Sequence, residues 1–388
     1  MSLDKKVKKK KKEINYNNTR YIAFKFMYIG KNYDGLVIQS TTKNTIEEII
    51  FNSLKRCKFL DPSKTNEELI TYSNYSRCGR TDKGVNSSGN VFALNLRYEE
   101  KYDYVKTLNS ILPNDIFILS SCFVDDSFDP RFSCLYREYK YYFLKKNMNI
   151  KKMQNAANLL CGFHNFKNFC KVDKSDEKWE EKNYERRIFE IRIEKVKSDN
   201  FVYPFDIKEN IIKNEYYQSY VCIIKGTAFL WHQVRCIMQI LFLIGDELED
   251  VDLINEMLNE KSNYEFKYGL ADENNLILSD CVFEFINFSN NESCTKNNND
   301  CELYIKLEKL YMQNLMECVI NTHFFNVAFK NNFGGLNYEN IFKKINQSRK
   351  KNKYTKLLQI KTNRMKDEEN NKDKKNTREK DKKDKIKE

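Results

Sequence analysis

Between positions 75 and 85 the chain reads Tyr75-Ser76-Arg77-Cys78-Gly79-Arg80-Thr81-Asp82-Lys83-Gly84-Val85. A glycine on either side of the group Arg80-Thr81-Asp82-Lys83 predicts a tight turn that presents those side chains outward. The stretch that follows, 91–97, alternates apolar and polar residues and is typical of a half-buried strand. We therefore expect a loop next to a strand, with Asp82 between two cations.

Composition allows three interpretations of this loop. A phosphate-binding loop would need Gly-x-x-x-x-Gly-Lys-Ser/Thr. Gly79 and Gly84 have that spacing, but Val85 and Asn86 follow where lysine and a hydroxyl are required, so we exclude this class. A solvated structural turn remains open. So does a reactive carboxylate, Asp82, kept ionised by the cations beside it.

Two later segments add candidates. Basic and aromatic residues interleave over 128–141, a pattern that suits base stacking beside phosphate contacts, although half-buried strands also favour tyrosine. In the segment 226–235, Arg235 falls in the first turn of an otherwise apolar helix. An arginine there needs solvent or an acidic partner, which is either a structural ion pair or a catalytic carboxylate.

The hydrophobic periodicity predicts an α+β protein. Strands are expected at 21–29, 91–97, 116–124, 137–144, 188–196 and 220–224. Helices are expected from a capping box at Thr45–Glu48 onward, and at 105–112, 153–160, 231–245 and 303–329. Two successive sets of these elements, 21–125 and 126–288, indicate two related halves packed around antiparallel or mixed sheets. A linker at 289–300 then leads to a C-terminal amphipathic helix, 301–329.

The net charge of +12 over 388 residues is unevenly distributed. Residues 1–20 carry 8 basic and 2 acidic groups, and residues 343–388 carry 19 and 8. The remaining middle of the chain is slightly acidic, so it could bind a polyanion only through a local patch. Both tails lack apolar periodicity and are expected to be disordered. They are either solvated segments or, alternatively, a nuclear-import signal or an RNA tether.

Several classes of protein are excluded. The longest apolar stretch, 236–244, falls short of the ~20 residues that a membrane span requires. The 12 cysteines form no Cys-x-x-Cys pair and only 3 histidines occur, so we expect no zinc or other metal site. The lysine run at 5–12 precedes no secretory-type apolar segment. It also lacks the Arg- and Ser-rich amphipathic character of a transit peptide, which favours the nucleus or cytoplasm over an organelle, the remaining alternative.

Taken together, the motifs resemble the tRNA pseudouridine synthase A family. The resemblance is carried by Gly79 to Val85, Arg131-Phe132-Ser133, Arg137-x-Tyr139-x-Tyr141 and Phe229 to Arg235. Further matches are Tyr28-Ile29-Gly30 with Tyr33 and Gly35, Leu112-Pro113-x-Asp115, His164 to Lys171 and Leu276 to Cys281. These are similar to the eukaryotic branch that modifies positions 38 and 39 in the tRNA anticodon stem-loop. The resemblance covers about 21–288 and weakens towards 329.

The resemblance implies a pseudouridine synthase fold in which the two halves form a central RNA-binding cleft. Asp82 would be the catalytic carboxylate, and Arg235 would pair with it. Tyr139 would stack on the extruded uracil, and Arg80 would fill the space left by the base or hold a phosphate. The implied partners are tRNA and a second copy of the chain, and no cofactor is needed.

The implied reaction is an isomerisation of uridine. The N1–C1′ bond breaks, the uracil turns, and C5 is joined to C1′, after the target has been flipped out of its stack. Whether Asp82 attacks the base at C6, attacks the sugar at C1′ or removes a sugar proton stays open. The alternatives are a related synthase with other target uridines and an inactive tRNA-binding or RNA-chaperone protein.

Overall fold

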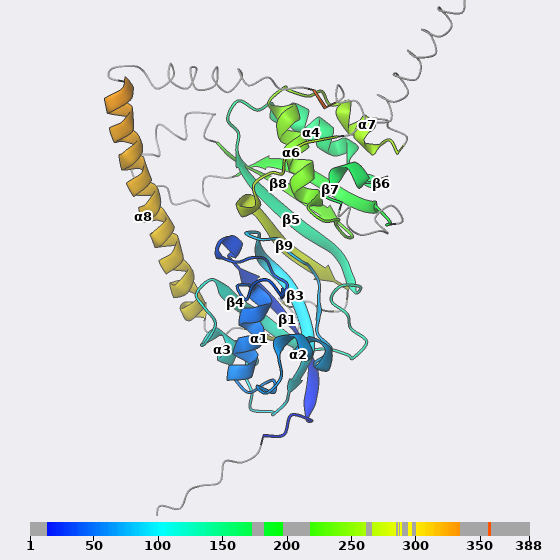
Figure 1. Ribbon diagram of the computed structural model, residues 1–388, viewed down its shortest axis with the longest axis vertical. Coiled ribbons are helices and arrows are strands. Elements are labelled where there is room, and N and C mark those ends of the chain that lie inside the picture. Colours follow the sequence, from blue (N-terminus) through cyan, green and yellow to red (C-terminus); the bar gives the residue numbers. More distant parts are fainter. Residues whose placement is uncertain are drawn as a thin grey trace, which may run out of the picture. The chain divides into compact units, whose positions relative to one another are not determined.

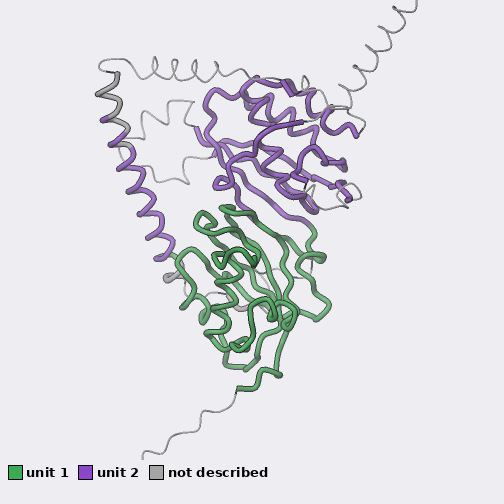
Figure 2. The backbone as a smooth tube through the Cα atoms, in the orientation of Figure 1, with its two compact units in different colours: residues 1–135, 280–304 green, residues 136–279, 305–388 purple. Residues whose placement is uncertain are grey.

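The computed structural model describes residues 14–172, 182–196, 218–260, 266–284, 286, 288, 294–296, 300–333 and 356–357. The chain divides into two compact units, coloured separately in Figure 2. Unit 1 comprises residues 1–135 and 280–304, and unit 2 comprises 136–279 and 305–388. These bounds differ from the expected halves, because 126–135 and 280–304 belong to unit 1.

Unit 1 is built on strands with the order β10-β4-β1-β3-β9, and the short β2 pairs with β3. Their bounds are β1 Thr19–Tyr28, β2 Ser76–Arg77, β3 Asn86–Arg97, β4 Ile116–Phe123, β9 Leu276–Phe283 and β10 Cys294–Lys296. The pairings of β1 with β3, β1 with β4, β2 with β3 and β10 with β4 are antiparallel. Strand β9 crosses the boundary between the units at Asp280.

Three helices accompany this sheet: α1 Ile46–Arg56, α2 Asn66–Tyr72 and α3 Tyr104–Asn109 (Figure 1). The alternation predicted for β1 is confirmed, because Ile22, Phe24, Phe26 and Tyr28 belong to one buried cluster together with residues of α1 and α3. The ring of Phe92 in β3 stacks on Phe24 with centroids 5.1 Å apart. Burying each such ring stabilises the fold by about 1.5–3 kcal/mol.

Unit 2 has the strand order β9-β5-β8-β7-β6, with β5 Cys134–Leu144, β6 Gly162–Asn165, β7 Glu185–Lys195 and β8 Ser219–Gly226. Its helices are α4 Ile150–Leu159, α6 Gln233–Gly245 and α7 Leu253–Leu258 (Figure 1). The predicted buried side of α6 is confirmed by Val234, Met238 and Leu241. The pairings of β5 with β8, β7 with β8 and β6 with β7 are antiparallel.

Helix α8, Asp300–Phe333, is longer than the expected 301–329. It carries several exposed apolar side chains, among them Ile305, Met312 and Phe324. Among the described helices of the chain, none is long and apolar enough to cross a bilayer.

The sequence prediction was wrong at the first helix cap. Thr45 Oγ accepts a hydrogen bond from the amide of Glu48, as a capping box requires. The carboxylate of Glu48 does not complete the box, and its Oε1 lies 4.0 Å from Lys43 Nζ instead. A complete box occurs at the next helix, where Thr65 and Glu68 bond reciprocally.

Segments expected to lack structure contain ordered pieces. Cys294–Lys296, placed in a linker by composition, pairs with β4 because backbone hydrogen bonding does not depend on side-chain polarity. In the N-terminal tail, Thr19 and Arg20 already belong to β1. In the C-terminal tail, the amide of Leu357 donates to Glu249 Oε1 at 2.7 Å, and the Leu357 side chain is buried. Residues 1–13, 343–355 and 358–388 of these tails lie outside the described residues.

Candidate active site

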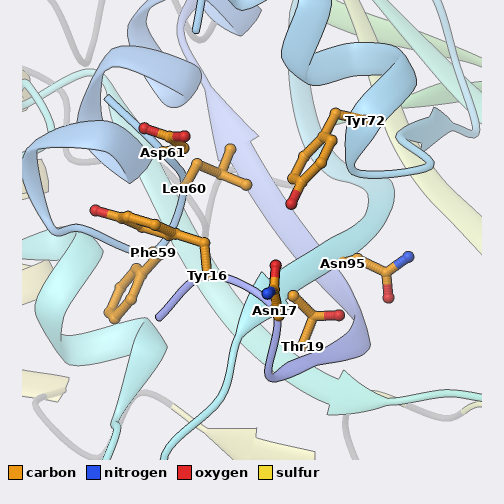
Figure 3. Close-up of a pocket in the computed structure, with 8 residues that line it drawn as sticks. All are labelled: Tyr16, Asn17, Thr19, Phe59, Leu60, Asp61, Tyr72 and Asn95. Carbon is orange, nitrogen blue, oxygen red and sulfur yellow. The ribbon is translucent and has the colours of Figure 1, made fainter. Parts of the chain in front are cut away.

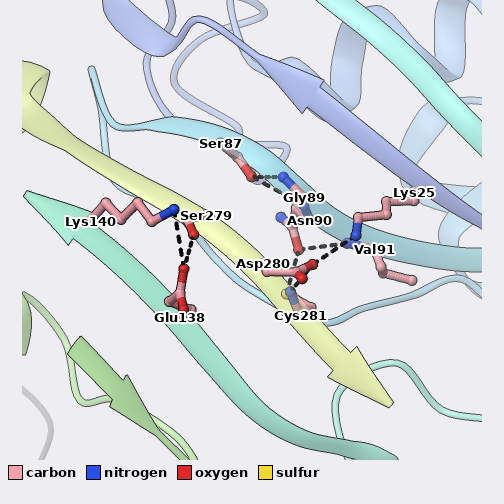
Figure 4. Close-up of polar contacts among 10 residues, drawn as sticks. All are labelled: Lys25, Ser87, Gly89, Asn90, Val91, Glu138, Lys140, Ser279, Asp280 and Cys281. Carbon is pink, nitrogen blue, oxygen red and sulfur yellow. Dashed lines mark hydrogen bonds and ion pairs between the residues drawn. The ribbon is translucent and has the colours of Figure 1, made fainter. Parts of the chain in front are cut away.

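The loop that carries Asp82 is tied to the strand that follows it. Asn90 in β3 is fully buried, and its side chain bonds to both main-chain groups of Gly79. The Gly79 amide donates to Asn90 Oδ1 at 3.0 Å, and Asn90 Nδ2 donates to the Gly79 carbonyl at 3.1 Å. Figure 4 shows that Oδ1 also meets the amide of Val91 and the thiol of Cys281. One amide side chain therefore fixes the first glycine of the loop.

The N-terminal segment of unit 1 holds the rest of the loop. The hydroxyl of Tyr28 lies 2.7 Å from that of Thr81, and both groups are buried. The Thr81 carbonyl accepts the amide of Leu36 at 3.1 Å, and the Gly84 amide donates to the Tyr33 carbonyl at 3.3 Å. Burial raises the pKa of Tyr28 well above its ordinary value, so its hydroxyl stays neutral.

Two glycines allow this close approach. A Cβ on Gly30 would lie 2.0 Å from the carbonyl oxygen of Val85. Gly35 has a φ of +102°, and a Cβ there would lie 3.2 Å from the Thr81 carbonyl. Larger residues at these positions would displace the loop, since the obstructing atoms belong to the backbone.

Asp82 is half-buried on this loop. Its carbonyl accepts the amide of Val85 at 3.2 Å, and Gly84 has a φ of +78°, which confirms the predicted tight turn. The expectation that the turn presents its side chains outward was wrong for Thr81, which is buried against Tyr28. The next residue, Lys83, forms an ion pair with Asp34 at 2.8 Å, and that contact is the first cause that lowers the pKa of Asp34. These contacts thus hold the backbone of the loop at Asp82 in one place.

Two arginines belong to this part of unit 1, Arg77 in β2 and Arg80 in the loop itself. Arg77 pairs with the buried Glu47 at 2.6 Å, and Glu47 also accepts the Tyr75 hydroxyl at 2.8 Å. Burial raises the pKa of Glu47, and these donors oppose that effect by favouring its charged form. Arg80 is exposed; partial burial, followed by the charges of Arg77 and Arg131, lowers its pKa.

In unit 2, Tyr139 faces the segment that leads into α6. It lies in β5 and is 9% exposed. The ring of Phe229 meets it edge to face, with centroids 5.0 Å apart. Gly226 makes room for this contact, because a Cβ there would lie 3.0 Å from the Phe229 ring. Phe229, to which the sequence analysis assigned no role of its own, therefore sets the position of the Tyr139 ring.

Arg235 has an acidic partner in its own unit. Its Nη2 lies 2.6 Å from Glu273 Oε2, and its Nε donates to the Ala271 carbonyl at 2.8 Å. The sequence analysis expected Arg235 to have an acidic partner or to face solvent. Glu273 is such a partner, and its bond with Arg235 is a structural ion pair. The neighbouring Tyr141 has its pKa raised to about 12, chiefly by burial. The pairing of Arg235 with Asp82 stays a prediction.

The four predicted site residues thus fall into two groups. Arg80 and Asp82 share one loop of unit 1, and Tyr139 and Arg235 lie on β5 and α6 of unit 2. Sequence reasoning missed the residues that support them, chiefly Asn90. The motif matches were the available signal, because Gly30 and Gly35 lie against the loop and Cys281 contacts Asn90.

Outside the loop, unit 1 contains a pocket of about 260 Å³ (Figure 3). It is lined by Tyr16, Asn17, Thr19, Phe59, Leu60, Asp61, Tyr72 and Asn95. Asn95 lies nine residues along β3 from Asn86, or ~30 Å from the end beside the loop. Within the described ranges, no group of three or more His, Cys, Asp or Glu side chains could hold a metal ion.

Known proteins match the chain over this region. A family model described as "tRNA pseudouridine synthase" matches residues 156–284. A "tRNA pseudouridine synthase A" of Methanosphaera stadtmanae is 32% identical over 279 residues, which are 70% of this chain and 88% of that protein. The chain belongs to the tRNA pseudouridine synthase family.

Within this family, eukaryotic relatives are also similar. The "tRNA pseudouridine(38/39) synthase" of Saccharomyces cerevisiae is 39% identical over 71% of this chain and 60% of the relative. The human protein of the same description is 37% identical over 68% and 56%. The chain thus spans little more than half the length of these two relatives. The solved archaeal box H/ACA sRNP Nop10-Cbf5 complex aligns with a TM-score of 0.25 and 10% identity, over 57% of this chain and 43% of that one, and supports no structural argument.

Proposed function

We propose that this chain converts uridine to pseudouridine in the anticodon stem-loop of tRNA, at positions 38 and 39. The observation that carries the proposal is its identity of 36–39% with four proteins described as tRNA pseudouridine(38/39) synthases. The fixed loop around Asp82 supports it, because a carboxylate held by the backbone suits a reaction that needs no external group.

Asp82 acts as the catalytic carboxylate in this proposal. The N1–C1′ bond breaks and the C5–C1′ bond forms, while the proton lost from C5 is balanced by one gained at N1. No oxidant, reductant or group donor enters. The hydrogen bonds from Asn90 and Tyr28 hold the loop, so the carboxylate is positioned before RNA arrives.

The other predicted residues act on the flipped base. Tyr139 stacks on the uracil, and its edge-to-face contact with Phe229 keeps the ring in position. Arg235 uses Nε and Nη2 for Ala271 and Glu273, which leaves its Nη1 hydrogens to pair with Asp82. Arg80 fills the space vacated by the base or holds a phosphate.

The larger assembly follows from the same proposal. The two units are related halves, and together they form the cleft that binds the stem-loop. A second copy of the chain completes a homodimer, and the protein resides in the nucleus or cytoplasm. The exposed apolar side chains of α8 support the homodimer. The lysine run at 5–12 supports residence in the nucleus or cytoplasm. Sedimentation of the pure protein and imaging of a tagged chain test them.

The activity is tested by incubating the purified protein with unmodified tRNA and with the isolated stem-loop, and then mapping pseudouridine. The proposal expects pseudouridine at positions 38 and 39. Modification at other positions would favour a related synthase with different targets. RNA binding without any pseudouridine would overturn the proposal in favour of an RNA-binding or chaperone role.

A further inference from the structure

A rigid turn follows β4 in unit 1. Asp129 Oδ1 accepts the amides of Arg131 at 2.7 Å and of Phe132 at 3.3 Å. The Asp129 carbonyl accepts the amide of Ser133 at 2.8 Å. An aspartate that bonds to the backbone two residues ahead is a recognised turn-forming arrangement. The turn therefore fixes the backbone of Arg131 and Phe132.

This turn is anchored beside the strand that leads into the Asp82 loop. The hydroxyl of Ser76 in β2 donates to Asp129 Oδ1 at 2.9 Å. At the base of the turn, the ring of Phe128 contacts that of Phe283 with centroids 5.4 Å apart, and Pro130 is buried. The turn is thus attached to the sheet of unit 1, as the Asp82 loop is.

Phe132 at the tip is 76% exposed. The guanidinium of Arg131 lies 5.1 Å from the centroid of its ring, and no second ring of the described chain lies against it. A single exposed apolar side chain is common on protein surfaces. A phenylalanine held on a fixed turn, with an arginine beside it, is instead suited to stacking on a base next to a phosphate.

The nearby arginines concentrate positive charge beside this turn. The charge of Arg77 is neutralised by Glu47. Arg80 has no hydrogen bond or ion pair to any residue that the structure describes, and it lies near enough to Arg131 for that charge to lower its pKa. Two neighbouring exposed cations repel each other, and an anion placed between them removes that repulsion.

We propose that Arg80, Arg131 and Phe132 form a nucleotide subsite, in which both arginines bind one RNA phosphodiester and Phe132 stacks on a base adjacent to the target uridine. The guanidinium group matches phosphate geometry. Arg80 is two residues from Asp82, so their Cα atoms are at most about 7 Å apart and the phosphate lies next to the reacting nucleotide. The inference rests on the proposed function, since its ligand is the RNA substrate.

The first part of the test alters the RNA and leaves the protein unchanged. Stem-loops are made with a single neutral methylphosphonate at each linkage flanking the target, or with a single abasic nucleotide on either side of it. Affinity is measured by fluorescence anisotropy at one fixed salt concentration. One neutral linkage is expected to weaken binding roughly 10- to 100-fold, the effect of removing a charge-assisted hydrogen bond, and one abasic position roughly tenfold.

The second part pairs each RNA with protein variants. Arg131→Ala should weaken binding to the normal RNA roughly 10-fold or more, and it should have no effect on the RNA whose sensitive linkage is neutral. Phe132→Ala should behave in the same way towards the abasic RNA, whereas Phe132→Trp should bind normally. Arg56→Ala is the control, because Arg56 is an exposed arginine at the C-terminal end of α1.

Several results would overturn the subsite. The wild-type protein could show equal affinity for every modified RNA, or Arg131→Ala could weaken binding as much on the neutral linkage as on the normal one. If Arg131→Ala fails to fold, Arg131→Lys and the wild-type series still decide. Failure of the proposed function is distinguishable, because it removes pseudouridine formation by the wild-type protein, while this test measures binding alone.

Discussion

Single side chains that make no proposed contact with RNA hold the Asp82 loop in place. Asn90 bonds to both main-chain groups of Gly79, and the hydroxyl of Tyr28 meets that of Thr81. These contacts are buried, so each is worth more than the same contact at the surface. The chemistry assigned to Asp82 therefore depends on residues that carry no reactive group themselves.

Replacing Asn90 by alanine tests this dependence. Asn90→Ala leaves two buried main-chain groups of Gly79 without partners, at about 1–3 kcal/mol each. We expect a lower melting temperature and a fall in kcat that exceeds the change in KM, because the loop loses its fixed position while the RNA surface stays intact. Asn95→Ala, on the same strand but half-buried, is the control. Normal kcat in Asn90→Ala would contradict the account.

Tyr139 allows a second test at the residue scale. Stacking needs only the aromatic ring, so Tyr139→Phe should keep more activity than Tyr139→Leu, for which kcat/KM should fall roughly tenfold or more. Tyr142→Leu, on the same strand and with its side chain on the opposite face, is the matched control. Equal activity of the phenylalanine and leucine variants would remove Tyr139 from the site.

At the scale of elements, short helices in unit 1 rely on their caps. Helix α2 has only 7 residues, too few for stability on propensity alone. The reciprocal bonds between Thr65 and Glu68 satisfy amides that the helix leaves open. The chain continues from this helix through Ser73 into the strand that precedes the Asp82 loop.

Removal of this cap should lower the stability of the protein by a measurable amount. Thr65→Ala is expected to reduce the free energy of unfolding by about 1 kcal/mol, as measured by urea denaturation. Thr71→Ala in the same helix is the control, and it should be neutral or slightly stabilising because alanine has the higher helix propensity. An unchanged midpoint for Thr65→Ala would show that packing, not the cap, holds α2.

The elements were predictable where apolar periodicity was strong. The strand at 19–28 and the helix at 233–245 each bury one predicted face against a core, and hydrophobic burial encodes that face directly. Strand β10 was not predictable, because Cys294–Lys296 lies among asparagines and has no periodicity. Its pairing with β4 is a contact between segments that are distant in the sequence, and the local hydrophobic pattern does not predict such a contact.

The candidate site was predictable only in part. Gly79 and Gly84 on either side of Asp82 predicted a turn, and the structure contains this turn. The partner of Arg235 was not predictable, because Glu273 follows 38 residues later and only folding brings the two together. Asn90 carries no sequence signal of its own, since a polar residue within a strand usually faces solvent.

At the scale of the whole molecule, the most basic segments of the chain are separate in sequence from the loop that carries Asp82. Residues 1–13 hold seven lysines, and the middle of the chain is slightly acidic. The positive charge near the Asp82 loop comes instead from Arg80, which is two residues from Asp82, and from Arg131, whose charge acts on Arg80. Long-range attraction of RNA and its positioning are therefore expected to depend on different parts of the chain.

Deletion of residues 1–13 tests this separation. We expect weaker RNA binding and a shallower dependence of log K on log salt, by about 0.7–0.9 for each RNA phosphate that the segment neutralises. The kcat at saturating RNA should not change, because Asp82 and its supports remain. A variant with the seven lysines replaced by arginine should keep the original slope. An unchanged slope after deletion would show that this segment is merely solvated.

The most direct test of the central claim is single-turnover pseudouridine formation by Asp82→Asn. This substitution keeps the shape of the side chain and removes its charge, so the rate should fall by roughly 10³-fold or more. Affinity for the stem-loop and the melting temperature should match those of the wild type, and Asp61→Asn, in the pocket at the far end of β3, should react at the normal rate. Wild-type rates in Asp82→Asn would contradict the assignment of Asp82 as the catalytic carboxylate.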